Sequence, residues 1–136
     1  MEFQIMSFSQ LEKTKFEKPV AIISISVDGT HPNLLRKHNV SDFVYLTFAD
    51  RDSGKDLISE MQAIMILEFA KKNKDKLIVC QCDAGISRSS AVAAALSKIH
   101  NDDDTWVFDS KDYRPNMYVY RILVTTSKYY ESIEQK

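Results

Sequence analysis

Apolar runs alternate with stretches of helical periodicity along the chain. The run "VAIISIS" at 20–26 is continuous and rich in β-branched residues, which is typical of a strand buried on both faces. Between 57 and 72 the apolar positions recur at helical spacing, so we predict a helix there with Asp56 as its cap. The apolar positions of this helix are Ile58, Met61, Met65 and Phe69. The remaining predicted elements are strands at 3–8, 42–48 and 76–81, and helices at 9–16 (capped by Ser9), from Arg88 to about 100, and after Asn116.

This order of elements predicts an α/β fold with a mostly parallel central sheet of about four to five strands flanked by helices. The chain has 136 residues and contains no linker or internal repeat, so we expect a single domain over 1–136. In such folds, ligands bind beyond the carboxyl ends of the strands, where the strand-to-helix loops gather. The loops after the strands at 42–48 and 76–81 are therefore the places to look for a site.

Composition narrows the classes of partner. The formal net charge of −1 disfavours a nucleic-acid binder, because such domains usually carry a basic excess. No apolar run approaches the roughly 20 residues that span a bilayer, and the N-terminal segment lacks the apolar region of a signal peptide. We therefore expect a cytoplasmic protein without membrane association. Cys80 and Cys82 are one residue apart, which is a poor disulfide framework, so free thiols are expected.

The loop "CDAGISR" at 82–88 lies between a predicted strand and a predicted helix. Ala84 and Gly85 keep the loop free of bulk, so its backbone N–H groups can turn inward and form an anion nest with the first turn of the helix. The positive end of the same helix would stabilise a thiolate on Cys82. Arg88 offers a planar fork of donors that fits two oxygens of a phosphoryl group. The loop therefore combines a nucleophile with a cradle for a tetrahedral anion.

The stretch "CDAGISRS" resembles the Cys-x5-Arg-Ser/Thr loop of the cysteine-based protein tyrosine phosphatases, and it is most like that of their small dual-specificity branch. The resemblance implies that Cys82 attacks phosphorus to form a cysteinyl phosphate, while Arg88 and the loop amides hold the equatorial oxygens. It implies that Ser89 stabilises the departing thiolate, and that neither a metal nor another cofactor is needed. The substrate-binding residues that it implies are Asp83, Ala84, Gly85, Ile86 and Ser87.

The resemblance also implies a general acid about thirty residues before the cysteine, since the leaving oxygen must be protonated. Asp50 lies 32 residues before Cys82, and Asp52 lies 30 residues before it. Asp50 comes directly at the end of a predicted strand, so we predict that it is the acid, with Asp52 as its rival. The "RPN" at 114–116 resembles the Pro-Asn that precedes the last helix in the dual-specificity branch, where Asn116 would brace the loop.

Several residues depart from the family pattern. Gln81 stands where the family usually has histidine, and glutamine can donate a hydrogen bond but cannot carry charge. Asp83 places a negative charge beside the anion site, and the loop lacks the lysines of the phosphoinositide phosphatases, so lipid headgroups are disfavoured. Cys80 points the same way as Cys82 in an extended strand and is predicted to be packed in the core. The three histidines have no mutually useful spacing and are predicted to be surface or loop residues; they are His31, His38 and His100.

These features predict a phosphate monoester hydrolase that acts, as a monomer, on phosphotyrosine in a phosphorylated protein or on a small aryl phosphate. Whether phosphoserine and phosphothreonine are accepted stays open. Two alternatives remain. One is a phospho-residue binding module that retains the pocket without turnover. The other is a sulfurtransferase with a persulfide on Cys82, although the loops of that class are usually one residue shorter.

Overall fold

The computed structural model describes residues 1–134. A four-stranded sheet has the order β1-β4-β2-β3, and each neighbouring pair of strands is parallel. This sheet confirms the predicted α/β fold with a mostly parallel sheet flanked by helices. Its strands are β1 (Glu2–Ser7), β2 (Val20–Ser26), β3 (Val40–Thr47) and β4 (Leu77–Cys82).

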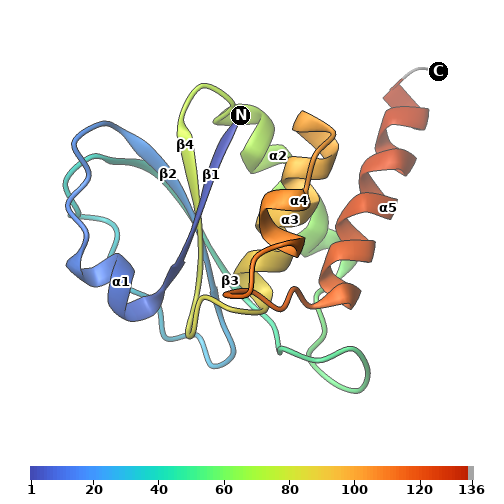
Figure 1. Cartoon of the computed structure of the whole chain (residues 1–136), viewed down its shortest axis with the longest axis horizontal. Coiled ribbons are helices and arrows are strands. Elements are labelled where there is room, and N and C mark those ends of the chain that lie inside the picture. The colour runs from blue at the N-terminus through green and yellow to red at the C-terminus, as the bar shows by residue number, and fades with distance from the viewer. Residues whose placement is uncertain (135–136) are drawn as a thin grey trace.

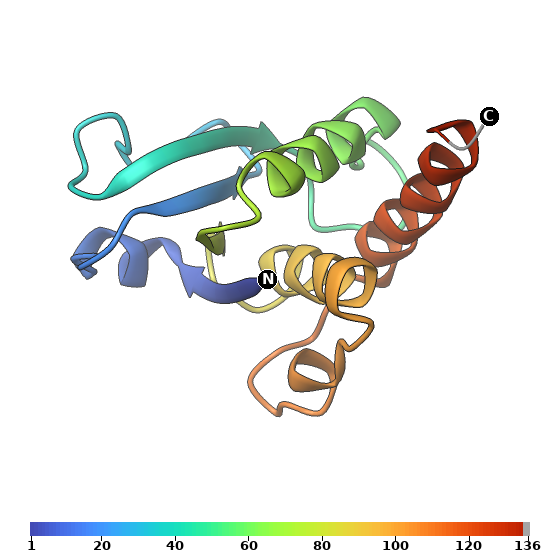
Figure 2. The same cartoon turned by 90° about the horizontal axis from the view of Figure 1, so that it is seen from above.

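Helices cover both sides of this sheet, but unequally. The longer helices α2, α3 and α5 lie together on one face, whereas the short α1 lies on the other side (Figure 1). Figure 2 shows the same arrangement from above, with α4 beyond α3. The bounds are α1 (Phe8–Lys13), α2 (Glu60–Lys72), α3 (Arg88–Asn101), α4 (Thr105–Phe108) and α5 (Met117–Glu134). Within residues 1–134, none of the helices has the length and apolar character needed to cross a membrane.

The strands fill two apolar layers, because successive side chains of a strand point to opposite faces. All of β2 is buried, which confirms the prediction of a strand buried on both faces. Both cysteines of β4 point to the same layer, the one beneath α2, α3 and α5. That layer takes Ala21, Ile23, Ile25, Cys80 and Cys82, and the layer on the side of α1 takes Val20, Ile22 and Val79.

Two predicted helix starts are wrong. The helix α1 begins after Ser7 rather than at Ser9, since Ser7 Oγ accepts from Gln10 N at 3.1 Å and Gln10 Oε1 accepts from Ser7 N at 2.8 Å. The helix α2 begins after Ser59 rather than at Asp56, and Ser59 forms the same reciprocal pair with the glutamine three residues later. Both starts follow the Ser-x-x-Gln capping box, which satisfies two backbone N–H groups where a lone cap residue satisfies one.

The buried face of α2 also differs from the predicted one. Met61 and Met65 are 65% and 41% exposed, whereas Ala63, Ile66 and Ala70 are completely buried. Apolar residues lie on several faces of this helix, so the spacing alone fits more than one stripe. The helix buries the face that packs between the sheet and α5.

The carboxyl ends of the parallel strands meet at one edge of the sheet, which lies at the bottom of the molecule in Figure 1. The loop after β3 (48–59), the loop after β4 (83–87) and the segment that leads into α5 (109–116) gather at this edge. The predicted site residues lie in these segments or directly beside them, since Cys82 ends β4 and Arg88 and Ser89 begin α3.

Candidate active site

The loop after β4 is pressed against the end of β1. Ser7 pairs with Cys82 in the sheet, and Phe8 N donates to the Asp83 carbonyl at 3.1 Å. Gly85 has a φ of +69°, and a Cβ at this position would lie 2.7 Å from Ser7 N. Both the left-handed conformation and the close approach exclude a side chain. Glycine is therefore required for this shape of the loop.

Carbonyl groups of this loop have hydrogen-bond partners, whereas its amide groups from 84 to 87 have none within residues 1–134. The Ile86 carbonyl accepts from Arg114 N, and the Ser87 carbonyl accepts from Asn116 N, both at 3.0 Å. No amide nitrogen from 84 to 87 donates to a group elsewhere in the described part of the chain. These amides lie beside the positive end of α3, which begins at Arg88. Unpaired amide donors at a helix N-terminus are what an anion nest requires.

Cys82 and Ser89 lie in direct contact beneath this loop. Cys82 is the last residue of β4, and Ser89 is in the first turn of α3. The Cys82 Sγ lies 3.1 Å from the Ser89 Oγ, and Cys82 is 2% exposed. A hydroxyl at this distance can donate a hydrogen bond to the sulfur.

Arg88 is 7% exposed, and its guanidinium contacts both the loop after β3 and the loop after β4. Its Nη1 donates to the Phe48 carbonyl at 3.1 Å, and its Nη2 lies 3.4 Å from Asp83 Oδ2. Its Nε is buried and finds no partner among the described residues. Because buried donors are nearly always paired, an unpaired guanidinium N–H is a donor available to an anion.

Asp50 is held against the cysteine loop. Its Oδ1 accepts from Ser87 Oγ and from Asn116 Nδ2, both at 2.8 Å, and Asn116 Nδ2 also donates to the Arg51 carbonyl at 3.1 Å. Asp52 is exposed in the same loop and makes no hydrogen bond within the described residues. Both aspartates line an open depression together with Ser87. The geometry thus brings Asp50 to the loop and leaves Asp52 facing solvent.

A chain of polar side chains behind Cys82 was not predicted from the sequence. Gln81 Oε1 accepts from Ser24 Oγ at 2.5 Å, and Ser24 Oγ lies 2.8 Å from His31 Nδ1. His31 is in a loop, as predicted, but it is half-buried and stacks on the Tyr45 ring with centroids 4.5 Å apart. The available signal was Ser24, a polar residue inside an otherwise apolar strand, because a buried hydroxyl needs a partner.

The second cysteine is a core residue. Cys80 is completely buried, and both cysteines are free thiols, as predicted. Burial, followed by the neighbouring Cys82 thiol, raises the pKa of Cys80 well above its ordinary value. Since the thiolate is the reactive form of cysteine, Cys80 is chemically quiet.

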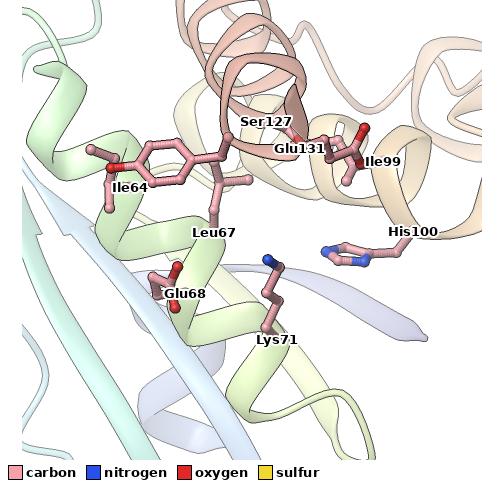
Figure 3. A pocket seen from close by; sticks show the side chains of 9 residues that line it. Ile64, Leu67, Glu68, Lys71, Ile99, His100, Ser127 and Glu131 are labelled. Atoms are coloured by element: carbon pink, nitrogen blue, oxygen red, sulfur yellow. The ribbon is translucent and has the colours of Figure 1, made fainter. Parts of the chain in front are cut away.

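His100 is not the surface or loop residue that was predicted. It is half-buried in the last turn of α3, whereas His38 is exposed in its loop as expected. The His100 ring borders a cavity of about 290 Å³ between α2, α3 and α5, where it points toward Lys71 (Figure 3). This cavity lies at the far end of α3 from Arg88, roughly 20 Å away along the helix, so it is separate from the cysteine loop.

Comparisons with known proteins give matches in structure only. No family model matches the chain, and no curated protein matches it in sequence. The crystal structure of the human tyrosine phosphatase-like serine/threonine/tyrosine-interacting protein is similar with a TM-score of 0.65 and 20% identity, covering 98% of this chain and 93% of that one. Human DUSP28 gives 0.58 and 15%, covering 96% and 94%. PTPMT1 in complex with PI(5)P gives 0.56 and 16%, covering 85% and 81%.

These structures match most of the chain and not only the loop around Cys82. The resemblance that the sequence of the loop suggested is therefore confirmed for the fold as a whole. The chain has the fold of the tyrosine and dual-specificity phosphatases.

Proposed function

We propose that the chain is a cysteine-dependent phosphate monoester hydrolase that acts on phosphotyrosine in proteins or on small aryl phosphates. The observation that carries this proposal is Arg88, whose buried Nε has no partner among the described residues, next to the contact between Cys82 and Ser89. Residues 1–136 then form one catalytic domain that works as a monomer without a cofactor.

In the first step, the Cys82 thiolate attacks phosphorus, an S–P bond forms, and the P–O bond to the leaving group breaks. The amides of 84–87 and the Arg88 Nε hold the three non-bridging oxygens as negative charge develops on them. The leaving oxygen takes a proton from Asp50. The hydrogen bond from Ser87 to Asp50 supports this role, since it keeps the carboxyl group at the rim of the loop.

In the second step, a water molecule attacks phosphorus, the S–P bond breaks, and its electron pair returns to Cys82. Asp50, now a carboxylate, takes the proton from the attacking water. Ser89 donates a hydrogen bond to the sulfur as it leaves. The separation of 3.1 Å between Ser89 Oγ and Cys82 Sγ supports that assignment.

Protein substrates fit this site better than phosphoinositides. PTPMT1 was crystallised with PI(5)P, so a related fold binds a phospholipid headgroup. In this chain the loop has no lysine, and Asp83 places a carboxylate 3.4 Å from the arginine. A headgroup with several phosphates would be repelled by that carboxylate more strongly than a single aryl phosphate, which carries less negative charge into the loop.

A phospho-residue binding module is the second candidate. Asp83 already occupies Nη2 of Arg88, and the neighbour with the TM-score of 0.65 carries a name that describes an interacting protein. A module of this kind would bind phosphate through the same loop without releasing product.

The test is hydrolysis of para-nitrophenyl phosphate across pH, with a chelator present. Wild type is compared with Cys82→Ser, Asp50→Asn and Asp52→Asn, and the control is Asp56→Asn, which alters a third aspartate of the same exposed loop. We expect no turnover by Cys82→Ser. Loss of the general acid should cost on the order of 10²-fold to 10⁴-fold and remove the basic limb of the pH profile.

Each result separates the candidates. If Asp52→Asn rather than Asp50→Asn loses the basic limb, the acid is Asp52. A wild type that binds orthovanadate but hydrolyses nothing is a binding module. Formation of thiocyanate from thiosulfate and cyanide, dependent on Cys82, would identify a sulfurtransferase. Phosphotyrosine and phosphoserine peptides of one sequence then define the substrate class.

A further inference from the structure

Gln81 precedes the nucleophile, but its side chain lies on the opposite face of the sheet from that of Cys82. Gln81 is 1% exposed, and its register partner in the neighbouring strand β2 is Ser24. A buried side-chain amide must be hydrogen-bonded, and Ser24 provides the bond to Gln81 Oε1. The residue before Cys82 is thus fixed from behind the sheet.

The direction of the hydrogen bonds follows from the donors available. The Ser24 hydroxyl carries one proton, and Gln81 Oε1 can only accept, so Ser24 donates to Gln81. Ser24 Oγ must then accept from His31 Nδ1, which therefore carries a hydrogen. The chain runs from His31 through Ser24 to Gln81, and the Nε2 of His31 is the nitrogen that gains or loses a proton.

His31 is also coupled to the cysteine loop by charge. The charged groups that act on it are Asp28 from its own loop and Asp83 from the loop after β4, and its ring stacks on Tyr45 of β3. Burial lowers the pKa of His31 below its ordinary value of 6.5, and the two carboxylates oppose that shift. Asp83 also contacts Arg88, so His31 interacts with the cysteine loop electrostatically as well as through its hydrogen bonds.

We propose that His31 is a positioning residue which, through Ser24, holds Gln81 and hence the loop from Cys82 to Arg88 in the shape that binds a phosphoryl group. The reactive role of that loop rests on the function proposed above. Without His31, the Ser24 hydroxyl is free to rotate away and leave Gln81 Oε1 buried and unpaired. The end of β4, which carries both Gln81 and Cys82, would then have to move so that Gln81 Oε1 finds another hydrogen-bond donor.

The test compares two replacements of His31 that differ in one property. His31→Phe keeps an aromatic ring on Tyr45 but has no donor, whereas His31→Asn keeps an N–H donor near the position of Nδ1 but cannot titrate. Ser24→Ala removes the hydroxyl that links His31 to Gln81 by hydrogen bonds. The matched control is His38→Phe, which alters the exposed histidine of the same loop. The readouts are kcat/KM for para-nitrophenyl phosphate from about pH 5 to about pH 8, the Kd for orthovanadate, and unfolding by urea.

We expect His31→Phe to lower kcat/KM and to weaken orthovanadate binding by roughly threefold to tenfold, the worth of one neutral hydrogen bond. His31→Asn should recover most of both and remove an ionisation on the acid side of the profile. The double variant of Ser24→Ala with His31→Phe should be no worse than either single variant, because both break one chain. His38→Phe should behave as wild type.

The proposal is overturned if His31→Phe matches wild type in both readouts. It is equally overturned if His31→Asn is as poor as His31→Phe, since a donor at this position would then not matter. An active wild type with unaffected variants would leave the hydrolase standing and remove the positioning role. If wild type is inert, but its orthovanadate affinity falls in His31→Phe and returns in His31→Asn, then the hydrolase is ruled out and the positioning role of His31 stands.

Discussion

Asn116 Nδ2 donates to Asp50 Oδ1 at 2.8 Å, and this bond joins the start of α5 to the loop after β3. The other end of the same amide caps α5, because Asn116 Oδ1 accepts from Tyr118 N at 3.0 Å and from Val119 N at 3.1 Å. One side chain therefore couples the first turn of a packed helix to a carboxylate at the site. Asn116 also contacts the cysteine loop, but through its backbone N–H, which donates to the Ser87 carbonyl at 3.0 Å.

Two replacements of Asn116 separate its cap from its bond to Asp50. Asn116→Ala loses both functions, whereas Asn116→Ser retains an oxygen that can cap the helix but cannot reach the aspartate. If the proposed function holds, we expect both variants to hydrolyse para-nitrophenyl phosphate more slowly than wild type, and only Asn116→Ala to lose about 1 kcal/mol of unfolding free energy through the cap. The measurements are para-nitrophenyl phosphate hydrolysis and urea unfolding. Wild-type activity in Asn116→Ser would show that the bond to Asp50 has no part in the reaction.

Gly85 and Gly29 form a matched pair for testing the shape of the cysteine loop. Both have a positive φ, of +69° and +86°, but a Cβ at Gly85 would lie 2.7 Å from Ser7 N, while a Cβ at Gly29 meets nothing within 4 Å. Gly29→Ala should cost only about 1 kcal/mol for the left-handed backbone. Gly85→Ala should cost more and should also abolish orthovanadate binding, because β1 and the loop must separate. Equal stability losses in the two variants, with binding intact in both, would contradict the close packing of Gly85 against Ser7.

The two cysteines should differ sharply toward alkylation, although both are buried. Iodoacetamide at neutral pH should modify Cys82 and leave Cys80 unmodified, since burial raises the pKa of the Cys80 thiol. Inorganic phosphate should protect Cys82 by occupying the loop. Trypsin releases both residues in one peptide, 77–88, so fragment-ion mass spectrometry must locate the adduct. Modification of Cys80 ahead of Cys82 in the folded protein would refute this assignment of reactivity.

Local patterns predicted some parts of the fold and site from the sequence. The strand β2 was predicted at its observed bounds because its continuous apolar run fits little else. The loop from Cys82 to Arg88 was placed correctly between a strand and a helix because its glycine, arginine and serine lie close together in sequence. The prediction of the buried face of α2 was wrong at Met61 and Met65, which are exposed. Several faces of that helix are apolar, and only its packing in the fold selects the one that is buried.

The contacts that the sequence did not predict join residues brought together by the order of the strands. Ser24 and Gln81 are 57 residues apart, and they meet only because β2 lies next to β4 in the sheet. His31 then reaches Ser24 from a loop whose path has no signature in the local sequence. The bond between Asp50 and Asn116 spans 66 residues in the same way. A role for Asn116 followed from the family resemblance, but its partner did not.

His100 gives the fold a sensitivity to acid that is independent of the cysteine loop. Its ring lies at the cavity of Figure 3, and its Nε2 is buried without a partner among the described residues. Burial lowers the pKa of His100 below 6.5, the positive charges of the N-terminal amine and Lys71 lower it further, and Glu131 partly opposes them. The unfolded chain therefore binds a proton at this histidine more readily than the folded chain does.

Because the unfolded state takes up the extra proton, the free energy of unfolding should be fully present above about pH 6.5 and should decline as the pH falls through the lowered pKa of His100. His100→Gln removes the titrating group, so we expect it to lose less unfolding free energy than wild type between about pH 7.5 and about pH 5. The measurement is urea unfolding of both proteins at each pH, with His38→Gln as the control for an exposed histidine. His38→Gln should lose as much unfolding free energy as wild type over the same pH range. If His100→Gln loses as much free energy as wild type over this range, acid sensitivity does not arise at the cavity between α2, α3 and α5.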